Sequence, residues 1–379
     1  MTKAGDGKEF GNLMSKSAKW PVLAAAAIVF TGLFLRAESN DHTRQVALTE
    51  STLRNKVVSF LRAKYAIPKT AAVTLGALGS SQDPAYYECT VQVTTGVKTT
   101  SRPISVSKDG RYLGLTPIFY LGRDPSQEMV ADARTFYKLP SVLNLTLGPF
   151  QDSVVPNFLQ TKVTLENHGK KEGAVFYVTT DKRYAVLGPV FILRSSGEIE
   201  RLINTNNQPC SGPPNAPVTI VEYADLECPT CARLQPILEG QLLSRYGNKI
   251  RVIYKDFPLP MHPWSRKAAI ASQCAYQIDP SAVAAYRTSI FAHQDQINFT
   301  NVRDQLLDLG EQAGINRLKL AACLDSDASL PRVEADLREG NELQVDSTPT
   351  CFINGQILVG LQPVENYYKA IDSALRDAH

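Results

Sequence analysis

A short apolar run leads directly into two cysteines that are two residues apart. The run, Val218–Val221, is rich in β-branched residues and suits a buried strand. Apolar residues at helical spacing follow, so Cys228 is expected at the N-terminus of a helix. Unpaired backbone N–H groups and the helix dipole favour a thiolate there and lower the thiol pKa. Cys231 lies one turn later on the same side and can close a disulfide with Cys228.

The alternative interpretation of the two cysteines is half of a zinc site. Such a site needs two more ligands at metal spacing, and the chain has no second Cys-x-x-Cys and no His-x-x-x-His. The pattern therefore favours a redox pair. We expect no metal and no other cofactor.

Length and charge restrict the possible classes of protein. The 379 residues suffice for two or three domains, and the composition, 44% hydrophobic and 20% charged, is that of a globular protein. The net charge of +3 is too small to argue for nucleic acid, and no basic patch interleaved with aromatics stands out. Nucleic acid is therefore not an expected partner.

An apolar run near the N-terminus, Trp20–Leu35, follows Lys16 and Lys19. It is short for a spanning helix, and it has only a poor cleavage site for a signal peptide. We favour an uncleaved anchor, with a cytoplasmic tail (1–19) and one membrane segment (20–36), over a cleaved signal. The lysines place the N-terminus inside. The expected location is the inner membrane, with the rest of the chain in the periplasm or its equivalent, where paired cysteines form disulfides.

The region between this segment and the cysteine pair contains an internal duplication. Four separate blocks recur without a gap at a single offset, as Tyr112 and Tyr184 show (184 − 112 = 72). The other blocks pair Tyr65 with Tyr137, Thr74 with Thr146, and Leu115 with Leu187. The matching residues are apolar, glycine, proline or turn residues, which is typical of a scaffold.

Each copy is predicted to be an α+β unit, with a helix followed by an antiparallel sheet. The first copy is placed at residues 40–123, with its helix at about Thr43–Tyr65. The second is placed at residues 124–203, with its helix at about Gln127–Leu139.

A proline-rich segment (204–217) is predicted to be a linker to the last domain (218–379). A second strand is expected at Ile250–Lys255, and two short strands around an Asn-Gly turn near residue 354. A mostly helical insertion separates them, and a helix ends the chain. The insertion helices are expected at about Ser265–Ile278, Ser281–His293, Asn301–Ala313, Arg317–Leu324 and Pro331–Leu343.

This order of elements, together with two phrases, resembles the thioredoxin fold of the DsbA family of thiol:disulfide oxidoreductases. The phrases are EYADLECPTC at residues 222–231 and TPTCFING at residues 348–355, and the resemblance covers about residues 215–377. It implies that Pro349 is cis and faces the active disulfide. A cis bond exposes the backbone of Thr348, which can pair with an extended substrate. Pro229 and Thr230 belong to the same expected substrate-binding surface.

The resemblance also implies a buried acid beneath the disulfide, and Glu222 occupies that position. Its carboxylate could relay the proton of Cys231. Asp225 and Glu227 are alternatives, for relay or as solvated acids. His262 stands in a His-Pro-Trp phrase, where packing is favoured over catalysis.

The second copy has a shorter likeness. Residues 176–191 resemble the last strands of the small dimerisation domain of DsbC-type isomerases, which suggests a cystatin-like unit. A homodimer through the repeats is therefore possible. The alternative is that the two copies imitate a dimer by pairing with each other.

The remaining five cysteines have separate interpretations. Some exported DsbA relatives carry a second, structural disulfide, which implies a Cys274–Cys323 bridge; two buried free thiols are the alternative. Cys351 is expected to be a buried inert thiol. Cys210 is expected to be accessible, and the position equivalent to Cys89 in the second copy is a threonine. Seven is odd, so at least one cysteine is unpaired or pairs between chains.

The sequence therefore predicts a membrane-anchored thiol:disulfide oxidoreductase that exchanges disulfides with exported proteins and is recycled by a redox partner. We favour an oxidase over an isomerase or reductase. The Pro-Thr pair between the cysteines lacks a histidine, which predicts a less extreme oxidant than the family type. A holdase or interaction protein with secondary redox activity, and a peroxidase, are rival hypotheses.

Overall fold

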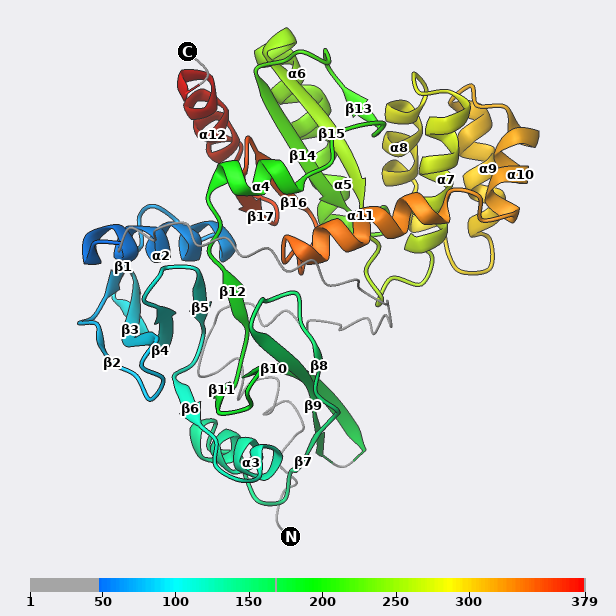
Figure 1. Ribbon diagram of the computed structural model, residues 1–379. Helices are drawn as coiled ribbons and strands as arrows, with labels where there is room; N and C mark the ends of the chain where they lie inside the picture. Colours follow the sequence, from blue (N-terminus) through cyan, green and yellow to red (C-terminus); the bar gives the residue numbers. More distant parts are fainter. Residues whose placement is uncertain (1–47, 168, 378–379) are drawn as a thin grey trace. The chain divides into compact units, whose positions relative to one another are not determined.

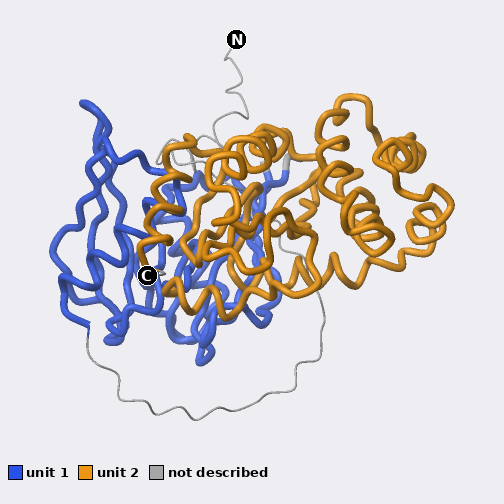
Figure 2. The backbone as a smooth tube through the Cα atoms, turned by 90° about the horizontal axis from the view of Figure 1, so that it is seen from above, with its two compact units in different colours: residues 1–193 blue, residues 194–379 orange. Residues whose placement is uncertain are grey.

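The computed structural model describes residues 48–167 and 169–377, and the chain divides into two units, residues 1–193 and residues 194–379 (Figure 2). The predicted tail and membrane segment, residues 1–19 and 20–36, lie outside the described residues. Within the described ranges, no helix is long and apolar enough to cross a membrane.

In the described part of unit 1, one order of elements occurs twice: a helix followed by six strands (Figure 1). Each strand of the second set begins 72 residues after its counterpart, as β9 does after β3 (158 − 86 = 72). The first set is α2 (Glu50–Lys64), β1 (Ala72–Leu75), β2 (Gly79–Ser80), β3 (Tyr86–Thr95), β4 (Lys98–Ser107), β5 (Tyr112–Gly114) and β6 (Ile118–Tyr120). The second set is α3 (Pro125–Phe136), β7 (Asn144–Leu147), β8 (Gln151–Asp152), β9 (Phe158–Asn167), β10 (Lys170–Thr179), β11 (Tyr184–Val186) and β12 (Val190–Ile192).

Capping residues decide where the two helices begin. Thr49 accepts a hydrogen bond from the N–H of Thr52 and so starts α2 later than the predicted residue 43. Asp124 does the same for α3, with Pro125 in the first turn, and starts it two residues before the predicted residue 127.

The two sets exchange their last strands. In one sheet the order is β1-β3-β4-β5-β12, and in the other it is β6-β11-β10-β9-β7. Thus Phe191 of β12 lies opposite Leu113 of β5, and Phe119 of β6 lies opposite Ala185 of β11. Each copy completes the sheet of the other. The predicted division at 123/124 therefore separates strands that are hydrogen-bonded partners.

Each sheet is covered by the helix of its own copy. Leu53, Val57 and Leu61 of α2 pack on Ile104 of the first sheet, and the exchanged Phe191 joins this core. Helix α3 packs on the second sheet, and the two form a separate hydrophobic core. A third cluster joins the copies; its buried members are Tyr86, Tyr112, Ile118, Val155, Phe158, Val186 and Val190.

A five-stranded sheet forms the centre of unit 2, in the order β13-β15-β14-β16-β17. The central strand β14 (Val218–Ala224) is parallel to β15 (Ile250–Asp256) and antiparallel to β16 (Thr350–Ile353). The edge strands are β17 (Gln356–Val359) and β13 (Cys210–Ser211). Apolar side chains alternate between the two faces of β14: Ile220 belongs to one core and Val221 to the other.

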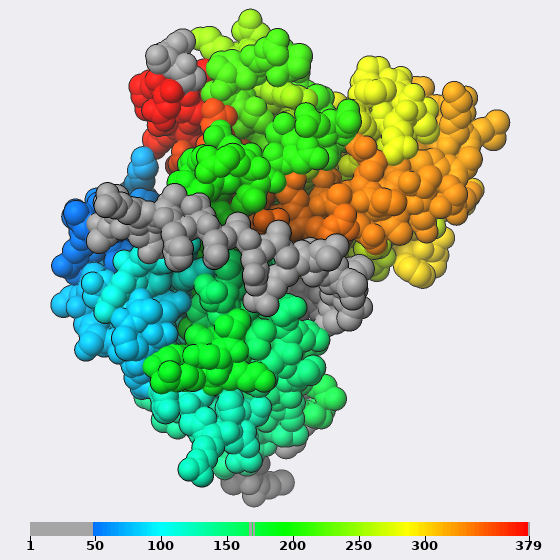
Figure 3. All heavy atoms as spheres, viewed as in Figure 1, coloured from blue at the N-terminus to red at the C-terminus, as the bar shows by residue number. Residues whose placement is uncertain are grey.

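Helices cover both faces of this sheet. One face packs on α5 (Pro229–Gln235), the π-helical turn Pro236–Leu242 that continues it, and α12 (Val364–Asp377). The other faces the insertion and α11, and in the space-filling view the insertion forms the yellow and orange lobe of unit 2 (Figure 3). The remaining helices are α6 (Leu243–Tyr246), α7 (Ser265–Ile278), α8 (Val283–Ala292), α9 (Val302–Gln312), α10 (Arg317–Asp325) and α11 (Leu330–Glu342), with short 3₁₀ turns at Gly247–Lys249 and Gln294–Gln296. The expected thioredoxin fold with a helical insertion is confirmed.

The segment before β14 differs from the prediction. Helix α4 (Ser196–Leu202) belongs to unit 2, because Ile199 and Leu202 pack against the insertion core. The predicted linker also contains β13, which pairs with Ile253 at the edge of the sheet. Proline excludes a segment from the centre of a sheet but not from its edge, and this explains the difference.

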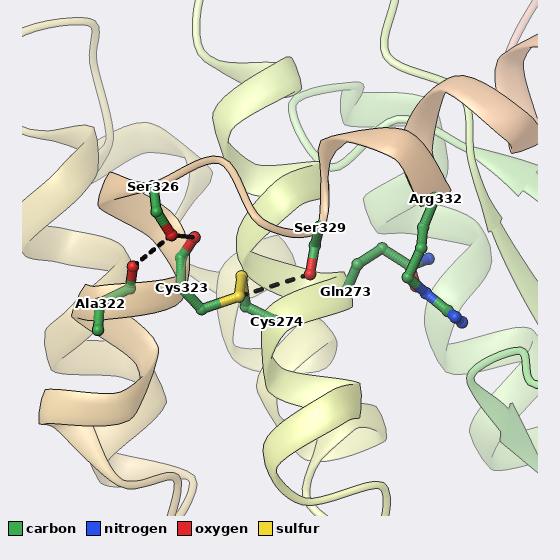
Figure 4. Close-up of a disulfide and its surroundings, with 7 residues drawn as sticks. All are labelled: Gln273, Cys274, Ala322, Cys323, Ser326, Ser329 and Arg332. Carbon is green, nitrogen blue, oxygen red and sulfur yellow. Dashed lines mark hydrogen bonds between the residues drawn. A yellow bond between two sulfur atoms is a disulfide. The ribbon is translucent and has the colours of Figure 1, made fainter.

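A disulfide joins Cys274 on α7 to Cys323 on α10 (Figure 4). The two cysteines are 49 residues apart in the sequence, and Cys274 is completely buried. The bond therefore ties together two helices of the insertion that covers one face of the sheet.

Replacing both of these cysteines with alanine is expected to lower the free energy of unfolding by about 2–4 kcal/mol, because the unfolded chain regains the entropy of a loop of this length. Denaturant titration of the purified protein measures the change. Cys210→Ala is the control, since that cysteine is free and half-buried. Equal stability of the double variant and the control would contradict a structural role for the bridge.

Candidate active site

Cys228 is the N-cap of α5, which begins with Pro229 directly after β14 and a short loop. The loop is closed by a hydrogen bond from the N–H of Cys228 to the carbonyl of Asp225 (3.0 Å). Cys228 retains 7% of its surface and Cys231 none. The sulfur predicted at an exposed helix end is thus mostly covered, but it is the more accessible of the two.

The opposite wall of the site is the segment before β16. The Thr348–Pro349 peptide bond is cis. The Sγ atom of Cys228 lies 3.5 Å from the carbonyl oxygen of Thr348. The structure therefore places two segments 120 residues apart in direct contact.

The two thiols have opposite pKa shifts. Hydrogen bonds from the Cys231 thiol and from the N–H groups of Cys231 and Thr230 outweigh desolvation and lower the pKa of Cys228 to about 5. Burial, together with donation to Cys228 and the negative charge of Glu222, raises the pKa of Cys231 well above its usual value. At neutral pH the pair therefore holds one thiolate, on the more accessible sulfur.

Replacing Thr348 with valine is expected to raise the pKa of Cys228. The Thr348 hydroxyl is buried without a hydrogen-bond partner among the described residues and is therefore free to donate to the thiolate, and valine removes it while keeping the shape of the side chain. The ultraviolet absorbance of the thiolate, followed against pH, measures the shift. Thr350→Val is the matched control, since that hydroxyl donates to the Ser347 carbonyl at 2.7 Å. The same pKa for Cys228 in both variants would contradict the role of Thr348.

Glu222 is completely buried on β14, and neither carboxylate oxygen has a hydrogen-bond partner among the described residues. Burial raises its pKa to about 7, and the nearby guanidinium of Arg287 opposes this shift. The carboxyl group is therefore poised to exchange a proton near neutral pH. Its charge also acts on Cys231, which is the thiol that must be deprotonated during resolution.

Asp225 and Glu227 have a different role from the one considered in the sequence. Asp225 is buried and accepts from the N–H of Glu227 (2.8 Å). Glu227 in turn accepts from the N–H of Trp264 (2.7 Å). These carboxylates fasten loops, whereas Glu222 alone of the three has no such bond. The structure thus favours Glu222 as the acid that serves Cys231.

His262 was expected to pack at the mouth of the insertion, and it does lie in the loop between β15 and α7 that opens the insertion. Its Nδ1 lies 2.7 Å from Oδ2 of Asp225. The only signal in the sequence was the His-Pro-Trp phrase, which does not specify the partner 37 residues earlier.

The other free cysteines lie apart from this exchange chemistry. Cys351 is buried on β16 opposite Glu222, and burial raises its thiol pKa well above the usual value. Burial also raises the pKa of Cys89 to about 11. Cys210, half-buried, accepts a hydrogen bond from Arg251. Within the described ranges, no group of three or more His, Cys, Asp or Glu side chains could hold a metal ion.

Comparison with known proteins agrees with this geometry. Residues 204–373 match the family model described as Thioredoxin. They form a thioredoxin-like domain. The match confirms the thioredoxin-type domain that the sequence predicted. The finer resemblances, of this domain to DsbA-family oxidoreductases and of residues 176–191 to DsbC-type isomerases, stay predictions.

The solved structures and curated relatives described below each match less than half of this chain. BdbD from Bacillus subtilis is 22% identical, with a TM-score of 0.43, over 46% of this chain and 95% of that one. The thiol-disulfide exchange protein α-DsbA2 from Wolbachia pipientis is 21% identical, with a TM-score of 0.42, over 46% and 91%.

The Na(+)/H(+) antiporter NhaA 3 of Salinispora tropica is 31% identical over 168 residues, or 44% of this chain and 24% of the relative. NhaA 1 of Salinispora arenicola has the same identity over 164 residues. The chain thus spans about a quarter of the length of these curated relatives.

Proposed function

We propose that this chain is an extracytoplasmic, membrane-anchored oxidase that donates the Cys228–Cys231 disulfide to exported proteins. The observation that carries the proposal is the asymmetry of the pair beside the cis Thr348–Pro349 bond. Cys228 has a pKa of about 5, and the pKa of Cys231 is raised. A stabilised thiolate favours the reduced enzyme, so the disulfide form tends to take up electrons.

The exchange occurs in two steps. A substrate thiolate attacks the Cys228 sulfur, the Cys228–Cys231 bond breaks, and Cys231 leaves as a thiolate that takes a proton from Glu222. A second substrate thiolate then attacks the substrate sulfur of the mixed disulfide, and Cys228 leaves as a stabilised thiolate. Two electrons pass from the substrate to the pair, and the substrate gains one disulfide. A membrane-bound or soluble redox partner must then oxidise the pair again.

Isomerase or reductase activity is the second candidate, and the strand exchange in unit 1 favours it. Because the copies complete each other's sheets, one chain holds what two chains would supply in a dimer. In the isomerase, the Cys228 thiolate attacks a wrong substrate disulfide and is released when the substrate rearranges. A homodimer through the repeats stays a prediction.

Refolding of a disulfide-containing ribonuclease distinguishes these activities. An oxidase is expected to restore activity to the reduced ribonuclease at a rate that depends on the disulfide form of the enzyme, and an isomerase to rescue the scrambled form when supplied as the dithiol. Cys228→Ala is the control and should abolish both. Failure of the wild-type protein with both substrates would overturn the proposed function.

Membrane anchoring and export rest on residues 16–41 of the sequence. A reporter active only outside the cytoplasm, fused after residue 379, is expected to be active and to sediment with membranes. Replacing the apolar run with polar residues is the control and should abolish export. A soluble, cytoplasmic fusion protein would contradict this part of the proposal.

A further inference from the structure

The loop between β15 and α7 is fastened to the loop before Cys228 by two carboxylates. Asp225 Oδ2 accepts a hydrogen bond from the N–H of Leu259 (2.7 Å), and Glu227 Oε2 accepts one from the N–H of Trp264 (2.7 Å). His262 lies between these two attachments. The two attachments therefore hold the imidazole beside Asp225, whose carbonyl oxygen accepts the N–H of Cys228 (3.0 Å).

His262 is itself bound to the buried carboxylate of Asp225. Nδ1 of the imidazole lies 2.7 Å from Asp225 Oδ2, and the Asp225 side chain is fully buried while 22% of the His262 side chain is exposed. Both oxygens of Asp225 already accept backbone N–H groups, from Glu227 and Leu259. A carboxylate in this setting is an acceptor, so Nδ1 carries the hydrogen.

The charges that face His262 are negative. They are the carboxylates of Asp225 and Glu227 and the thiolate of Cys228. The hydrogen bond to Asp225 is the main cause of a raised pKa for His262, and partial burial opposes it. The imidazolium is therefore favoured when Cys228 is a thiolate. Because an interaction between two sites is reciprocal, the imidazolium also favours that thiolate.

We propose that His262, protonated and held by Asp225, is a positioning residue that stabilises the Cys228 thiolate and makes the pair more oxidising. The inference rests on the proposed disulfide exchange. It gives the site the positive charge that the Pro229-Thr230 pair does not supply. The hydrogen bonds to Cys228 remain the larger contribution, and His262 adds to them. No proton moves from His262; its charge acts when negative charge develops on the leaving Cys228 sulfur.

The effect has a defined pH dependence. The pKa of His262 is raised, so its cation is present below that pKa and is lost as pH rises through it. The additional stabilisation of the Cys228 thiolate is lost over the same range. The oxidising strength of the pair should therefore fall with rising pH by more than the two thiols alone require.

His262→Gln tests the proposal, because the glutamine amide can still donate to Asp225. We expect the equilibrium constant for oxidation of glutathione to fall roughly three- to tenfold in mildly acidic buffer, as one nearby charge warrants, and to match wild type at high pH. The pKa of Cys228 should rise. His262→Lys should have the wild-type equilibrium constant for glutathione oxidation in mildly acidic buffer and should keep that value at high pH. His293→Gln, whose Nδ1 lies 2.8 Å from the Ser289 carbonyl, is the matched control.

The proposal would be overturned if the pKa of Cys228 is unchanged in His262→Gln, or if the equilibrium constant for glutathione oxidation falls by the same factor at every pH. If His262→Gln does not fold, the pH profile of His262→Lys decides alone, and a wild-type profile in that variant overturns the inference. The thiolate titration uses the dithiol protein without a substrate. Failure of the proposed function would thus appear as a wild-type enzyme that refolds no ribonuclease, while the effect of His262 on Cys228 could still be measured.

Discussion

Replacing Cys231 with serine is expected to trap covalent complexes with substrates, whereas replacing Cys228 with serine is expected to trap none. The low pKa of Cys228 supplies a thiolate that attacks substrate disulfides, and without the Cys231 thiol the mixed disulfide has no intramolecular resolving group. We expect steady-state exchange to fall at least about a thousandfold in both variants, because the two sulfurs act as a unit. Non-reducing electrophoresis and mass spectrometry detect the adducts.

Cys351→Ser is the control for this pair of variants. It removes a buried thiol whose raised pKa prevents attack, and exchange should continue. Adducts that map to Cys351, Cys210 or Cys89 would contradict the assignment of the active pair, as would adducts in Cys228→Ser.

Replacing Glu222 with glutamine is expected to slow formation of the mixed disulfide, the step in which Cys231 leaves and takes the Glu222 proton, by roughly a hundredfold, the usual contribution of a positioned acid or base. It is also expected to stabilise the protein above pH 7. The carboxyl pKa rises from 4.5 to about 7 on folding, so its contribution to stability is full below pH 4.5 and is lost as pH rises through about 7. Glutamine cannot ionise. The gain at high pH is about 3.5 kcal/mol, from about 2.5 pKa units at about 1.4 kcal/mol each.

The pH profile separates this effect from that of Cys228. The pKa of Cys228 is lowered from 9.0 to about 5 on folding. The contribution of Cys228 to the stability of the dithiol protein therefore increases as pH rises from about 5 to 9, whereas that of Glu222 decreases as pH rises. Denaturant titrations of wild type and Glu222→Gln, both as dithiols, share that contribution, and their difference isolates Glu222. Glu365→Gln, at an exposed position on α12, is the control and should follow wild type. A Glu222→Gln variant with wild-type stability at pH 8 and a wild-type rate of mixed-disulfide formation below pH 7 would contradict the role of Glu222.

The sequence predicted unit 2 well because its signals are local. Apolar β-branched runs mark β14 and β15, helical periodicity marks the insertion, and two phrases mark the site. Choosing Glu222 over Asp225 and Glu227 required hydrogen-bond partners, which no pattern contains. The contact of His262 with Asp225 was not predicted for the same reason, since Asp225 lies on another loop.

Strand exchange in unit 1 could not be predicted from the repeat. The apolar pattern of β6 is satisfied equally by a sheet of its own copy or of the other, because both copies present the same residue types at the same offset. The three residues that connect β5 and β6 decide which sheet β6 joins. The direction in which they lead the chain depends on tertiary packing, which the repeat pattern does not contain. Edge pairing is specified by geometry more than by sequence.

The equilibrium redox potential of the Cys228–Cys231 pair tests the central claim most directly. Equilibration of the purified protein with glutathione buffers, read by alkylation of free thiols, gives this value. An oxidase with a stabilised Cys228 thiolate predicts a potential between those of protein disulfide isomerase, about −180 mV, and DsbA, about −120 mV. A potential near that of thioredoxin, about −270 mV, would contradict the account.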